Sequence, residues 1–213
     1  MTLAAVISDW SAPNQERAKK LLDAYPHERS AVMPLLYVAQ LEHGHLTAAG
    51  MAQVAKLTGL TSAQVQSVAS FYTMYKRDHV GKYLISVCTS ISCFLMGAGD
   101  VLAAVEEESE ALDGTTSAGG TYSVEHVECI GACGGAPAVQ VNYELIEGVT
   151  PEKGKALCKW LNDAVPEVVL ADEMQELFGG VRSFDWGSKE AEGAVAAVPA
   201  FGPYGSAKKE SRA

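Results

Sequence analysis

Long apolar runs are missing from this sequence of 213 residues, and no segment comes near the roughly 18 apolar residues that a membrane-spanning helix needs. The N-terminus has no basic segment ahead of an apolar stretch, as a signal peptide would. Glycine-rich phosphate-binding loops and a nucleophile elbow are also missing, so we expect no nucleotide site on this chain. These absences predict a cytoplasmic chain with no direct membrane insertion, which would reach a membrane only through a partner.

Basic residues are scarce relative to acidic ones. The chain has 16 Lys and Arg against 26 Asp and Glu, which gives a formal net charge of −10. A surface of this sign repels a phosphate backbone, so we expect no nucleic-acid partner. The hydrophobic share of 48% is that of an ordinary globular protein.

The first part of the chain, residues 1–80, predicts an N-terminal helical bundle. Apolar residues recur at helical spacing, as in Val32, Leu35, Leu36 and Ala39. Ser, Thr and Pro stand at the expected starts, and Pro or Gly at several ends. The expected helices cover 14–25 and 30–41, and two more begin at Thr47 and Thr61.

From residue 81 the pattern becomes strand-like, and residues 81–165 predict an α/β domain of thioredoxin-like kind. The expected strands are 83–87, 122–128, 138–142 and 144–146, with helices at 94–108 and 151–163. Residues 166–213 are expected to form a C-terminal extension, partly flexible, with one further helix over 167–178. Phe184 and Trp186 in this extension suggest docking of a partner.

Four of the five cysteines form two tight pairs, Cys88 with Cys93 and Cys129 with Cys133. Each pair follows a predicted strand, so two loops could build one four-thiolate site. Structural zinc usually takes closer C-x2-C pairs, and a redox dithiol prefers C-x-x-C at a helix start. The looser spacings favour a [2Fe–2S] cluster, while zinc and a dithiol remain alternatives.

Small residues surround the second pair, in the run from Gly131 to Ala136. Backbone N–H groups could approach sulfur closely there and offset the negative charge of a thiolate-bound cluster. Cys93 is expected at the start of a helix, where free N–H groups would face the same site. Cys158 lies apart on the last predicted helix of the domain and is expected to be a buried apolar residue.

Two motifs resemble those of the E subunit of NADH:quinone oxidoreductase, respiratory complex I. They are Val68–Tyr75 (VASFYTMY), and Val127–Cys133 (VECIGAC) with Ala136–Pro137 after it. Gly81–Tyr83, leading to Val87–Thr89, resembles the strand that enters the first cysteine. The resemblance runs from about residue 12 to residue 161.

The resemblance implies a helical bundle followed by a thioredoxin-like ferredoxin domain, with one [2Fe–2S] cluster held by Cys88, Cys93, Cys129 and Cys133. It also implies a partner subunit that binds FMN and NADH, further peripheral-arm subunits, and a place on the cytoplasmic side of the inner membrane. The chain itself would be an electron carrier without catalytic residues.

Similar subunits occur in NAD-linked formate dehydrogenases and in NAD-reducing or electron-bifurcating hydrogenases, so these complexes are the alternative. A zinc-stabilised interaction module without a redox role is an alternative of a different class.

Overall fold

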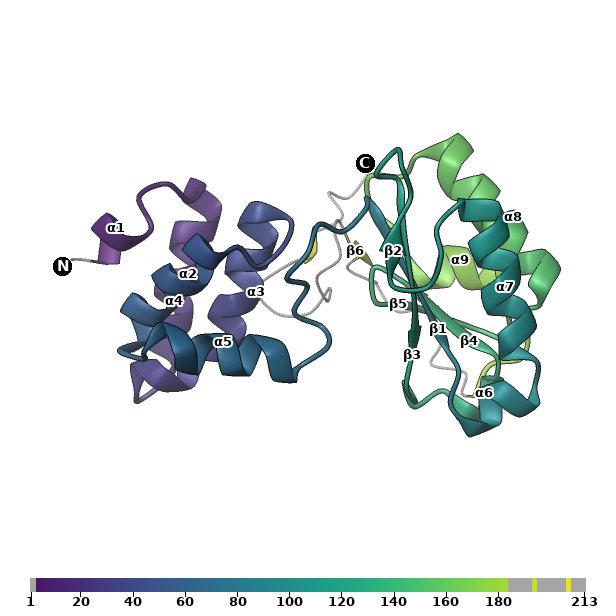
Figure 1. Cartoon of the computed structure of the whole chain (residues 1–213), viewed down its shortest axis with the longest axis horizontal. Helices are drawn as coiled ribbons and strands as arrows, with labels where there is room; N and C mark the ends of the chain where they lie inside the picture. The colour runs from purple at the N-terminus through teal and green to yellow at the C-terminus, as the bar shows by residue number, and fades with distance from the viewer. Residues whose placement is uncertain (1–2, 184–192, 195–205, 208–213) are drawn as a thin grey trace, which may run out of the picture. The chain divides into compact units, whose positions relative to one another are not determined.

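The computed structural model describes residues 3–183 and the short segments 193–194 and 206–207 (Figure 1). The described chain divides into two compact units, one up to His79 and the other from Val80 onward. Phe184 and Trp186 lie outside the described residues. In the part of the chain that is described, no helix is both long and apolar enough to cross a membrane.

The first unit consists of helices, as the sequence predicts. They are α1 (Leu3–Val6), α2 (Ala12–Ala24), the 3₁₀ helix η1 (Glu28–Ala31), α3 (Val32–His43), α4 (Ala48–Thr58) and α5 (Ser62–Phe71). Thr47 caps α4 by accepting the N–H of Gly50, and Thr61 and Gln64 form a capping box on α5. α3 is the central helix of this unit, with Leu35, Leu36 and Val38 fully buried.

The second unit is a mixed α/β domain, and its elements follow the predicted order with some additions. They are β1 (Tyr83–Cys88), α6 (Ile91–Leu95), α7 (Ala98–Ser109), β2 (Thr115–Thr116), β3 (Tyr122–Val127), the 3₁₀ helix η2 (Cys133–Gly135), β4 (Ala138–Val141), β5 (Glu144–Glu147), α8 (Pro151–Ala164) and α9 (Ala171–Phe178). The segments β6 (Gly193–Ala194) and β7 (Ser206–Ala207) pair with each other.

The sheet of this unit has the order β2-β3-β1-β4-β5. β1 and β3 are parallel, with Cys88 opposite Val127, and the other neighbouring strands are antiparallel. α7 and α8 lie side by side along the sheet (Figure 1). β2 was not predicted, because it is two residues long within a polar stretch.

The single helix predicted over 94–108 is wrong: the structure has two helices, α6 and α7. Gly97 separates them with a φ of +90°, a left-handed conformation that glycine adopts without the steric cost of a side chain. α6 is therefore a separate short helix next to Cys88, and it carries Cys93.

α9 belongs to the same hydrophobic core as the strands. Val169, Met174 and Phe178 are buried in one cluster with Ile85 and Ile146. Burial of such a side chain contributes about 1.5–3 kcal/mol to folding, so the chain up to Phe178 is firmly built into this unit. The helix begins at Ala171, four residues later than predicted.

Candidate functional site

The parallel pairing of β1 with β3 brings the two cysteine pairs to one edge of the sheet. Cys88 is the last residue of β1, and Cys129 follows the end of β3 by two residues. Cys93 lies in α6, directly after β1, and Cys133 is the first residue of η2. All four side chains named from the sequence therefore lie at the carboxyl end of this strand pair.

The two pairs differ in burial. Cys88 and Cys93 are each 2% exposed and pack with Ala98, Ala132 and Ala138. Cys129 and Cys133 are exposed, and their Sγ atoms lie 3.4 Å apart. All five cysteines are free thiols.

The four thiols also influence one another across the pairs. Burial is the main cause that raises the pKa of Cys93 to about 11; Cys88 and Cys133 act in the same direction, while the N–H of Ala138 opposes the rise by donating to the sulfur. The hydrogen bond to Cys129 is the main cause that raises the pKa of Cys133, and Cys88 contributes as well. Thiolates gathered in this way repel each other, so a bound cation would stabilise them.

The donor set fits a two-iron cluster. Four cysteine sulfurs are its usual ligands, and each iron takes two of them. In the described part of the chain, no three His, Cys, Asp or Glu side chains are grouped as ligands of one metal ion. One backbone N–H, that of Ala138, is directed at a sulfur, and the hydroxyl of Ser92 donates to Cys133.

The expected position of Cys93 at a helix start needs correction. α6 begins at Ile91, so Cys93 is its third residue, and the helix has only five residues. A helix this short has a small macrodipole, so the predicted contribution of its dipole to the site is small.

The small residues of the second cysteine loop have a different reason from the predicted one at Gly135. A Cβ built there would collide with Oε1 of Glu147 and lie 2.7 Å from the carbonyl oxygen of Val181. Gly135 is therefore required by close packing against β5 and against the chain that follows α9.

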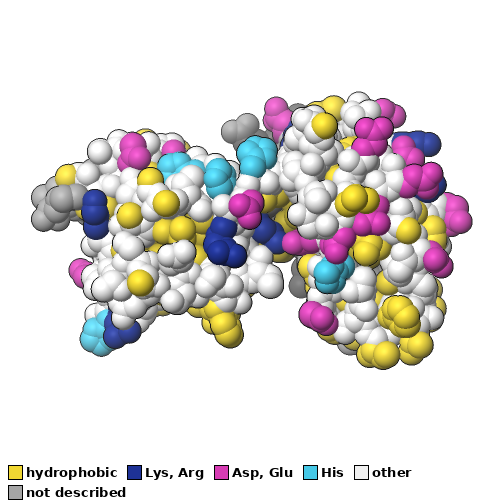
Figure 2. Space-filling model, viewed as in Figure 1, with side chains coloured by type: hydrophobic (Ala, Val, Ile, Leu, Met, Phe, Trp, Pro, Cys, Tyr) yellow, Lys and Arg dark blue, Asp and Glu magenta, His cyan; other side chains and the backbone are white. Residues whose placement is uncertain are grey.

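An exposed apolar patch on and beside α6 was not found from the sequence. It consists of Ile91, Phe94, Leu95 and Met96, each between 63% and 74% exposed. Figure 2 shows hydrophobic side chains gathered at the end of the second unit where α6 lies. The consecutive apolar residues Phe94–Met96 were the available signal, but the predicted long helix assigned them to an amphipathic face.

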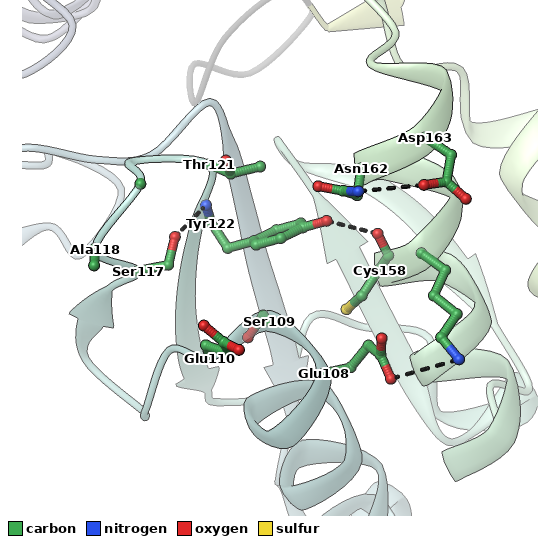
Figure 3. A pocket seen from close by; sticks show the side chains of 12 residues that line it. Glu108, Ser109, Glu110, Ser117, Ala118, Thr121, Tyr122, Cys158, Asn162 and Asp163 are labelled. Carbon is green, nitrogen blue, oxygen red and sulfur yellow. Dashed lines mark hydrogen bonds and ion pairs between the residues drawn. The ribbon is translucent and has the colours of Figure 1, made fainter.

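Cys158 lies apart from the other cysteines, as predicted. It is 1% exposed in the core of the second unit, and burial raises its pKa to about 12. It borders a cavity of about 380 Å³ between α8 and the loop before β3, where the Tyr122 hydroxyl donates to its carbonyl oxygen at 2.6 Å (Figure 3). The side chains of Glu108, Glu110 and Asp163 make this cavity acidic.

Residues 18–162 match the model of the thioredoxin-like [2Fe–2S] ferredoxin family. This chain belongs to that family. The match spans most of the helical unit and the α/β domain, including all four paired cysteines, and it confirms the thioredoxin-like fold predicted from the sequence.

Curated relatives of this ferredoxin carry the name of the E subunit of NADH-quinone oxidoreductase. The chain is 40% identical over 150 residues to the protein of Mycobacterium tuberculosis, covering 70% of this chain and 60% of that relative. It is 35% identical over 154 residues to the protein of Rickettsia conorii, covering 70% of this chain and 92% of that relative. The chain thus spans about 60% of the length of the mycobacterial relatives.

Among solved structures, this ferredoxin is similar to an NAD⁺-reducing [NiFe]-hydrogenase in the air-oxidised state. The TM-score is 0.58 at 19% sequence identity, over 69% of this chain and 25% of the hydrogenase chain. At this identity the similarity shows the shared fold.

Proposed function

We propose that this chain is the [2Fe–2S] electron-transfer subunit of the NADH dehydrogenase module of an NADH:quinone oxidoreductase. Cys88, Cys93, Cys129 and Cys133 would hold the cluster. The observation that carries the proposal is the gathering of these four thiols at one sheet edge, in a family member related to curated E subunits.

The bound cluster would supply one-electron oxidation and reduction, which side chains alone cannot perform. The chain's own contribution is the environment of the sulfurs. Cys88 and Cys93 are shielded by packed alanines, and the N–H of Ala138 donates to Cys93. Burial disfavours added negative charge and hydrogen bonds to sulfur favour it, so these two features act in opposite directions on the reduction potential.

The partner would be a subunit that binds FMN and NADH, and further peripheral-arm subunits would complete the assembly on the cytoplasmic side of the inner membrane. The exposed patch on α6 supports docking at the cluster face, because it contains four large apolar side chains beside Cys93. A partner seated there would cover the cysteines and shorten the path of the electron.

Leu95→Ser tests this docking face. Leu95 is 74% exposed, so the change should leave folding intact and weaken binding to the flavin-bearing subunit about tenfold or more. Leu112→Ser is the matched control, since Leu112 is 68% exposed but lies outside the patch. Equal binding of both variants in a titration would remove the patch from the interface.

Anaerobic purification tests the cluster itself. The protein should be red-brown, contain two iron atoms per chain as the cluster formula requires, and show a two-iron paramagnetic signal after reduction. A colourless protein with one zinc per chain would instead establish the zinc-stabilised interaction module.

The nearest alternative keeps the cluster but changes the complex. The fold shared with an NAD⁺-reducing hydrogenase favours considering such an assembly, and an NAD-linked formate dehydrogenase is the other case. The subunits that co-purify with the chain separate these complexes: quinone-reductase subunits support the proposal, and a hydrogenase or formate dehydrogenase subunit would replace it.

A further inference from the structure

After α9 the chain returns to the cysteine site. Residues 179–183, called here the return segment, run along the end of β5, where the N–H of Gly180 donates to the carbonyl of Glu147 at 2.7 Å. The next residue of that strand end, Gly148, donates its N–H to the carbonyl of Gly135 at 2.6 Å. One backbone stretch therefore joins the return segment on one side to the cysteine loop on the other.

Glu147 is the fixed point of this arrangement. It is only 4% exposed, and its Oε1 accepts the N–H of Ser183 at 3.0 Å and the hydroxyl of Ser183 at 2.5 Å. Its backbone N–H donates to the side chain of Gln175 at 2.7 Å, and its carbonyl accepts from the same side chain at 3.1 Å. Since a buried carboxylate is costly unless it is hydrogen-bonded, these contacts specify one position for it.

The cysteine loop rests directly on this carboxylate. A Cβ at Gly135, two residues after Cys133, would collide with Glu147 Oε1. A Cβ at Gly134 would lie 3.1 Å from Oγ and 3.3 Å from Cα of Ser183. The backbone that follows Cys133 is therefore packed against both members of the Glu147–Ser183 hydrogen-bonded pair.

We propose that Glu147, held by Ser183, is a positioning residue for the exposed cysteine pair, and that the return segment is thereby a structural part of the cluster site. The inference rests on the proposed function for the identity of the cluster. It adds that the second cysteine loop, which is otherwise exposed, takes its position from a buried acid on β5.

Glu147→Ala is the principal test, with Glu147→Gln as the conservative variant and Glu144→Ala as the matched control. Glu144 lies on the same strand, three residues earlier, and carries the same side chain. Gln retains an oxygen that can accept from Ser183, whereas Ala cannot. Ser183→Ala, which removes one donor of two, gives a milder change if Glu147→Ala does not fold.

Three measurements apply to the full chain: the paramagnetic line shape of the reduced cluster, the rate of iron loss to a chelator, and amide hydrogen exchange of residues 130–136 without metal. Glu147→Ala should alter the line shape, lose iron about tenfold faster and exchange faster in the loop, as expected for an outer residue that orients metal ligands. Glu147→Gln should restore all three, and Glu144→Ala should match the wild type. Ser183→Ala should shift them in the direction of Glu147→Ala, by less.

The outcomes separate the two proposals. If Glu147→Ala matches Glu144→Ala in line shape, iron loss and exchange, the positioning role is wrong. If the wild type holds no cluster, the proposed function fails, and the exchange of residues 130–136 still decides whether Glu147 anchors the loop.

Discussion

Cys88 and Cys93 lie in the hydrophobic core, whereas Cys129 and Cys133 are exposed, although both pairs have similar spacing in the sequence. The first pair is fixed by a strand, a helix and packed alanines. The second pair sits on a loop whose backbone leans on Glu147 and Ser183. The difference shows that one half of a symmetric ligand set can be placed by core packing and the other half by hydrogen bonds from behind.

Serine substitutions should give the largest effects and divide the pairs. Any of Cys88→Ser, Cys93→Ser, Cys129→Ser or Cys133→Ser should abolish or badly distort the cluster, measured by visible absorbance. Without metal, Cys88→Ser and Cys93→Ser should also destabilise folding by about 1–3 kcal/mol, because they put a hydroxyl into an apolar core. The exposed pair should change by about 0.5 kcal/mol or less in urea unfolding. Equal losses from both pairs would break the comparison.

Thiol labelling of the metal-free protein should show the next largest difference. Cys129 and Cys133 are exposed, and Cys88 and Cys93 are 2% exposed, so a maleimide should modify the first-named pair at least about tenfold faster. Mass spectrometry of timed samples gives the order of modification. Rapid labelling of Cys93 would mean that α6 opens in the metal-free state.

Stability measurements across pH would sharpen the comparison once the effect of Glu144 is removed. Burial, and to a lesser degree Asp172, raises the pKa of Glu144 to about 7, although the N–H of Ala171 opposes the rise. Since the folded pKa lies above the unfolded one, the stabilisation is present below about pH 4.5 and is lost as the pH rises towards 7. Glu144→Gln should therefore gain about 1 kcal/mol at pH 8 after allowance for solvent screening, and nothing at pH 4. A gain that is the same at both pH values would show that charge is not its cause.

Cys158→Ser supplies the smallest expected effect on the cluster, namely none. Cys158 is buried with Leu157 and Leu161 in the main core, away from the four paired thiols. Its substitution should lower stability yet leave the visible absorbance intact. Loss of colour in this variant would show that the ligand assignment is wrong.

Local signals in the sequence predicted much of the fold. Helical spacing and Thr caps gave α4 and α5, and runs of β-branched residues gave β1 and β3. Proximity of the cysteines followed from two strands that each end near a pair. Burial of one pair and exposure of the other did not follow, because they depend on packing between α6, η2 and β4.

The anchoring by Glu147 was beyond sequence reasoning for a similar reason. Gly135, Glu147 and Ser183 are far apart along the chain, and no periodicity links them. The position of the break at Gly97 was available from the residue type, but an amphipathic pattern through it favoured a continuous helix.

The parallel register of β1 with β3 also determines when the site can exist. A parallel pair cannot form by a tight turn, so α6 and α7 must first cross over before Cys88 meets the strand that leads to Cys129. The Ala138 N–H that contacts Cys93 comes later still in the chain. During synthesis, therefore, the first two cysteines emerge as free thiols and wait for the third and fourth, which makes iron insertion a late step of maturation.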